Sequence, residues 1–126
     1  MHKKLFLSAA VSALLLSLVA IGIAQDKSVA LTGVIVDKMC SARVGKAADV
    51  MAAANGHKKG CALSDGCQAS GFGVFSDGKF YEFDAKGNEL AKAKLTESKK
   101  DTGAKFKVEG KLAESKLAVT SITELE

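Results

Sequence analysis

Three cysteines and a histidine carry most of the chemistry that this sequence offers. The cysteines are Cys40, Cys61 and Cys67, and His57 lies between the first two of them. Thiolate and imidazole groups are the ligands that copper(I) and zinc(II) prefer. Met39, directly before Cys40, adds a thioether, which suits copper(I). One interpretation of this set is therefore a soft-metal site with Cys40, His57, Cys61 and Cys67 as ligands.

The spacing of the cysteines favours a disulfide instead. The chain has no Cys-x2-Cys pair, and Cys61 and Cys67 are further apart than the ligand pairs of compact zinc sites. In a strand, Met39 and Cys40 would also point to opposite faces. A bridge from Cys40 to either later cysteine would stabilise the fold by about 3 kcal/mol. We therefore expect one disulfide and one spare thiol, with all three pairings open.

Thiol-redox and hydrolytic chemistry find less support. Lys58 and Lys59 lie close to Cys61 and would favour its thiolate form, but the chain has no Cys-x-x-Cys motif. His57 stands alone in a glycine-rich segment, and no Walker, dinucleotide-binding or HExxH motif is present. We assign no catalytic residue and expect a protein that is not an enzyme.

The first 24 residues have the anatomy of a secretory signal peptide. A basic start with Lys3 and Lys4 precedes an apolar run over residues 5–23, and Gly22 and Ala24 provide a small-x-small cleavage site. We predict cleavage after Ala24, export to the periplasm or the exterior, and no membrane attachment afterwards. An oxidising compartment also allows cysteines to pair.

Removal of residues 1–24 lowers the positive charge of the chain. The whole chain has a formal net charge of +4, and the predicted signal peptide holds two of its 18 basic residues but none of its 14 acidic ones. The remaining charge of +2 gives no strong nucleic-acid signal. We expect residues 25–126 to form a single small domain and a monomer.

The pattern of residues predicts a mainly β domain with short helices. The predicted strands cover 29–36, 72–76, 79–84, 105–110 and 117–122, the predicted helices cover 46–54 and 88–95, and the segment 56–71 is expected to be a loop. Asp77-Gly78 is a strong signal for a type I′ hairpin turn. Five strands with a helix between the third and fourth match the order of a small OB-like β-barrel. The cysteines fall in an insertion at about 37–71.

Aromatic residues gather around the predicted hairpin. In an OB-like barrel such residues could form a platform for single-stranded nucleic acid or oligosaccharide. Because the chain has no tryptophan and these residues follow strand periodicity, we expect them to fill the core instead. The set comprises Phe72, Phe75, Phe80, Tyr81 and Phe83.

The opening of the predicted domain resembles a family of small exported bacterial proteins of unknown function. The resemblance rests on a Gly-x-(Ile/Val)-x-Asp-x-Met-Cys motif at residues 33–40, an Asp-Gly-Lys hairpin at 77–79, and Val-x-Gly and Val-x-Ser-Ile segments near the end of the chain. It implies export, a bacterial source and cysteines that matter, but no activity. The chain departs from the family in the wider spacing of Cys61 and Cys67 and in having Ser41-Ala42-Arg43 where a histidine often follows the first cysteine.

Three functional hypotheses follow from the sequence. The first is a structural or ligand-binding envelope protein with one disulfide. The second is a soft-metal binding protein, for copper or zinc, or a thiol-redox protein that uses the three cysteines. The third is single-stranded nucleic-acid or oligosaccharide binding on the barrel face.

Overall fold

A computed structural model describes residues 27–126, so the predicted signal peptide and its cleavage site at Ala24 lie outside the described residues. Five strands form one closed sheet in the order β1-β2-β3-β5-β4. All neighbouring strands are antiparallel except β3 and β5, which are parallel. The strands are β1 (Lys27–Asp37), β2 (Phe72–Ser76), β3 (Lys79–Phe83), β4 (Lys105–Ala113) and β5 (Lys116–Leu125).

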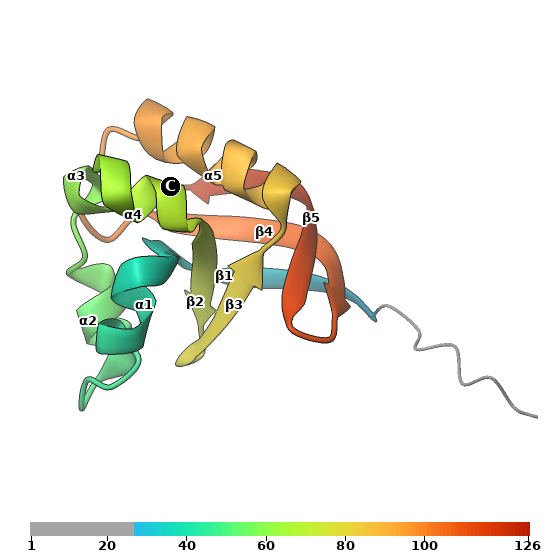
Figure 1. The fold of residues 1–126 in the computed structure, drawn as a ribbon, viewed down its shortest axis with the longest axis horizontal. Coiled ribbons are helices and arrows are strands. Elements are labelled where there is room, and N and C mark those ends of the chain that lie inside the picture. The colour runs from blue at the N-terminus through green and yellow to red at the C-terminus, as the bar shows by residue number, and fades with distance from the viewer. Residues whose placement is uncertain (1–26) are drawn as a thin grey trace, which may run out of the picture.

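Five helices accompany the sheet. Four of them connect β1 to β2: α1 (Lys38–Val44), α2 (Val50–Asn55), α3 (Lys59–Ala62) and α4 (Asp65–Ser70). The fifth, α5 (Ala85–Glu97), connects β3 to β4. Figure 1 shows α1 to α4 gathered at one end of the sheet, with α5 lying across its side. Among the helices of residues 27–126, none has the length and apolar character needed to cross a membrane.

Two apolar clusters hold these layers together. The larger cluster fills the sheet interior and includes Ile35, Phe72 and Phe106. The smaller cluster joins the outer face of β1 and β2 to α1 and α2, and it includes Val36 and Phe75. Because side chains alternate along a strand, successive residues of β1 and β2 contribute to opposite clusters. Both strands are therefore buried on both faces at this end, where α1 and α2 pack against the sheet.

The hairpin and the last two strands confirm the sequence predictions. Asp77 and Gly78 both have positive φ, at 49° and 81°, as a type I′ turn requires. In β4 and β5 the residues predicted to face inward are buried: Phe106, Val108, Leu117, Val119 and Ile122. The slight irregularity expected in the last strand is a register shift opposite Glu109 and Gly110. Phe72, Phe75 and Phe83 are buried, as the core interpretation predicts.

The helical predictions were partly wrong. The segment expected as a loop at 56–71 contains α3 and α4, and α1 was missed. The helix predicted at 46–54 begins later, at Val50, because Asp49 caps it by accepting a hydrogen bond from the Ala52 amide. Asp84, not Asn88, caps α5, since its side chain accepts a hydrogen bond from the amide of Gly87. These short helices have little periodicity and form through their caps and their packing.

Gly33 marks the point where β1 changes partner. Residues up to Gly33 pair with β4, and residues from Val34 onward pair with β2. A Cβ atom at Gly33 would overlap the backbone carbonyl of Phe75 in β2. The bend that the sequence predicts at this glycine is therefore a place of close backbone approach, where only glycine fits.

We predict that Gly33→Ala lowers the free energy of unfolding by about 3 kcal/mol or more, because backbone atoms must move to admit the methyl group. Gly60→Ala is the matched control, since nothing lies within 4 Å of the added atom at that helical position. Chemical denaturation of both variants checks this. Equal stabilities of the two variants would contradict the close approach at Gly33.

Candidate metal site at the cysteine-bearing helices

The three cysteines, spread over 28 residues of sequence, converge at one end of the sheet. Cys40 lies in α1, Cys61 in α3 and Cys67 in α4. Their Sγ atoms all lie within 4.8 Å of one another, and all three are free thiols. The predicted disulfide is thus not formed here, although the predicted residues are brought together. Cys67 is buried, Cys40 is partly buried and Cys61 is exposed, so the cluster opens to solvent on the α3 side.

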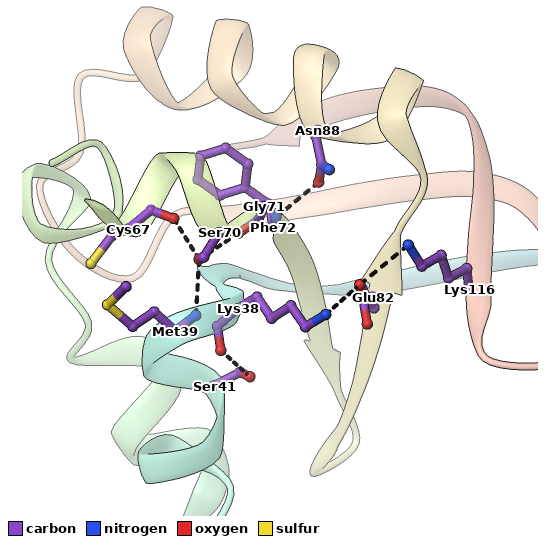
Figure 2. A network of polar contacts seen from close by, with 10 residues as sticks. All are labelled: Lys38, Met39, Ser41, Cys67, Ser70, Gly71, Phe72, Glu82, Asn88 and Lys116. Carbon is purple, nitrogen blue, oxygen red and sulfur yellow. Dashed lines mark hydrogen bonds and ion pairs between the residues drawn. The ribbon is translucent and has the colours of Figure 1, made fainter. Parts of the chain in front are cut away.

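Helices α1 and α4 are joined by hydrogen bonds that set Cys40 next to Cys67. The Lys38 amide donates to the Gly71 carbonyl at 2.8 Å, and the Met39 amide donates to the Ser70 hydroxyl at 3.0 Å. The same hydroxyl donates to the Cys67 carbonyl at 2.6 Å. Figure 2 shows this chain of contacts running from the start of α1 to the end of α4. Two free amides in the first turn of α1, those of Lys38 and Met39, are thus satisfied by the last residue of α4 and the glycine that follows it.

A separate set of contacts holds α3 and its cysteine. The Lys59 amide donates to the Asp101 carbonyl at 2.7 Å, and the Lys59 side chain donates to the Ser98 carbonyl at 2.6 Å. Both acceptors lie in the connection between α5 and β4. Cys61 is therefore positioned by contacts with a segment that lies far along the chain from all three cysteines. The spacing of the cysteines gives no sign of these contacts, so it does not predict that the three converge.

Asp37 is the buried polar centre of this end of the molecule. It is the last residue of β1 and is 0% exposed. One carboxylate oxygen accepts a hydrogen bond from the Cys40 amide at 2.9 Å and so caps α1. The other oxygen lies 2.8 Å from Nε2 of His57, whose side chain is also buried. Asp37 thereby fixes the positions of both Cys40 and His57.

His57 and Asp37 form a second group of potential ligands with Cys40. One ligand atom from each lies within 4.8 Å of the others, so Cys40 belongs to both this group and the thiol cluster. In metal sites a histidine ligand commonly hydrogen-bonds a carboxylate through its other ring nitrogen, which fixes the orientation of the ring. His57 is therefore placed close to Cys40, the one cysteine that the two groups share, with Asp37 already holding its Nε2 atom.

The environment of Cys40 favours the neutral thiol. Burial, followed by the charge of Asp37 and a hydrogen bond to it, raises the pKa of Cys40 to about 12. A thiol of this kind is a poor nucleophile near neutral pH, because the thiolate is the reactive form. Metal binding would have to displace the proton.

An open cleft of about 430 Å³ adjoins the cluster and gives access to it. Cys61 and His57 line the cleft together with the basic side chains Arg43 and Lys58.

Glu82 of β3 forms ion pairs with two lysines. It accepts a hydrogen bond from Lys38 at 2.9 Å and lies 3.5 Å from Lys116 (Figure 2). The hydrogen bond from Lys38, with the charges of both lysines, lowers the pKa of Glu82. This ion pair ties the start of α1 to the sheet.

The site thus contains every residue that the sequence put forward as a ligand, together with Asp37, whose part was missed. An aspartate directly after an apolar strand is a common helix cap, but this role becomes visible only once α1 is recognised. Met39 and Cys40 lie in the first turn of α1 and not in a strand, so the objection from strand alternation does not apply to them.

The comparisons with known proteins add no identification. No family model matches the chain, and neither the curated proteins nor the solved structures include a match.

We predict that Asp37→Ala destabilises the protein by about 2–4 kcal/mol, because it removes a helix cap and leaves the buried His57 without its partner. Asp49→Ala is the matched control, since Asp49 makes the same capping contact in an exposed position. That variant should lose only about 1 kcal/mol. Urea denaturation measures both, and similar losses would show that the buried pair contributes nothing beyond the cap.

The raised pKa of Cys40 predicts slow alkylation at alkaline pH. In the unfolded chain the pKa of Cys40 should be near 9.0, whereas in the folded protein it is raised to about 12. At pH 10 Cys40 of the folded protein should react at least about 10-fold more slowly than in urea. The same difference makes the folded state progressively less stable as pH rises through this interval. Pulsed iodoacetamide labelling with peptide mapping gives the rate, and equal rates in both states would contradict the prediction.

Proposed function

We propose that the protein binds one soft metal ion, copper(I) or zinc(II), through the thiolates of Cys40, Cys61 and Cys67. The observation that carries the proposal is the convergence of all three sulfur atoms within 4.8 Å. Thiolates bound at about 2.3 Å to a shared ion lie roughly 3.8 Å apart, so shifts of about one ångström would bring them onto a metal. Three thiolates from three helices are also a ligand set that binds soft metals strongly.

The disulfide hypothesis accounts for less of this geometry. A disulfide requires two sulfurs at about 2.05 Å and leaves the third thiol without a role. Two contact sets, one that joins α1 to α4 and one that holds α3, keep all three cysteines, and not one pair, close together. A thiol-redox function would in turn need a thiolate of low pKa, whereas the pKa of Cys40 is raised.

His57 and Asp37 support the metal hypothesis from beside the thiols. His57 is a candidate fourth ligand for zinc(II), which takes cysteine and histidine in tetrahedral sites. Asp37 would orient it, and it already holds the amide that begins the helix of Cys40. Partners of this kind commonly contribute 10–100-fold to metal affinity.

We propose that the metal site belongs to an OB-like barrel and that the protein is exported. The closed strand order, the parallel pairing of β3 with β5 and the helix between β3 and β4 support the OB-like class. The basic and apolar pattern of residues 1–24 supports export. We infer that the sheet serves as a rigid support and that the four helices between β1 and β2 carry the function.

Metal titration of reduced protein under anaerobic conditions tests the proposal. We expect one equivalent of copper(I) or zinc(II) to bind and to protect all three thiols from alkylation. Cys61→Ser should lower the affinity at least about 100-fold without unfolding the protein, because Cys61 is an exposed ligand. Thr96→Ala removes an exposed hydroxyl of α5 that bonds the Lys92 carbonyl, so it serves as the matched control and should bind as wild type does.

Intact-mass analysis of protein recovered from an oxidising compartment distinguishes the two main hypotheses. A metal-loaded chain with three protected thiols supports the metal site. One disulfide, one free thiol and no stoichiometric metal after reduction would exclude it.

A further inference from the structure

Met39 is an exposed thioether at the rim of the thiol cluster. It is 60% exposed, and within residues 27–126 no other large hydrophobic side chain is classed as exposed. It belongs to the first turn of α1 and directly precedes Cys40. Neither apolar cluster of the fold includes it. Core packing therefore does not account for a methionine at this position.

The side chain of Met39 lies over the helix that carries Cys67. Its terminal methyl group is 3.8 Å from the position that a Cβ atom would take on Gly66, the residue before Cys67. Its amide is tied to Ser70, whose hydroxyl bonds the carbonyl of Cys67. Figure 2 shows Met39 and Cys67 with their sulfur ends on the same side of this contact. The thioether thus lies beside the thiol cluster and faces solvent.

The chemistry of a thioether distinguishes the two candidate metals. Zinc(II) is bound by cysteine, histidine and carboxylate groups, and a neutral thioether adds little to such a site. Copper(I) is a softer ion that takes both thiolate and thioether ligands. A methionine side chain is also flexible and can adapt its position to a neighbouring group.

We propose that the site selects copper(I) and that Met39 is its solvent-facing fourth sulfur ligand, through which the ion enters and leaves. This inference rests on the proposed metal function of the three cysteines. Ligand exchange at copper(I) moves the ion without a change of oxidation state, so no electron donor or acceptor is needed. The copper source or recipient is a partner that offers soft sulfur or imidazole ligands at the exposed side of α1.

Met39→Leu and Met51→Leu form a matched pair for the test. Both changes remove one thioether and keep the side-chain volume nearly constant. Met51 is partly buried and packs against the smaller apolar cluster, whereas Met39 is exposed and belongs to neither cluster. Competition with bathocuproine disulfonate measures copper(I) affinity, and competition with a zinc chelator measures zinc(II) affinity. We expect Met39→Leu to weaken copper(I) binding about 10-fold, with zinc(II) binding unchanged and Met51→Leu equal to wild type in both assays.

X-ray absorption on selenomethionine-labelled protein loaded with copper(I) gives a direct readout. Wild-type and Met51→Leu protein should show copper–selenium scattering, and Met39→Leu protein should not. Unchanged copper(I) affinity in Met39→Leu, or no copper–selenium scattering while the cysteines still bind the ion, would overturn the role of Met39 and leave the proposed metal site intact. Failure of the wild-type protein to bind either metal would overturn both.

Discussion

The buried carboxylate of Asp37 is the contact on which the functional end of this protein depends. It ends β1 and caps α1, and it holds the imidazole of His57 from the segment between α2 and α3. Placing a carboxylate in the protein interior is costly unless each oxygen has a partner. Here both oxygens are satisfied, so the sheet, the first helix and the histidine are held in one arrangement.

Around this carboxylate, the cysteine-bearing helices are held by two sets of contacts. The start of α1 bonds α4, while α3 bonds the connection after α5. The outer faces of β1 and β2 pack against α1 and α2. A site held in this way is preorganised for a ligand that needs three donors at once, since ordering the donors costs little further entropy. The same arrangement leaves Cys61 and Met39 accessible from solvent.

Some of the fold and site could be predicted from particular residues. Asp77-Gly78 predicted its hairpin because few residue pairs adopt positive φ at two successive positions. Strand alternation predicted that Phe106 and Val108 face the interior of the sheet. The helices α1, α3 and α4 could not be predicted in this way. Each is seven residues or shorter, and helices of that length are stable only through caps and tertiary contacts.

The sequence by itself determined the strands, the hairpin and the kinds of ligand atom, because these follow from local periodicity and side-chain chemistry. Export stays a prediction that rests on the basic and apolar pattern of residues 1–24. Only the tertiary structure decided that the three thiols meet, that Asp37 joins Cys40 to His57, and that Met39 contacts the helix that carries Cys67. Those outcomes depend on contacts between residues 20 or more positions apart, such as Asp37 with His57 and Lys59 with Ser98. Spacing along the chain does not predict these contacts, because the intervening backbone can adopt many conformations until packing selects one.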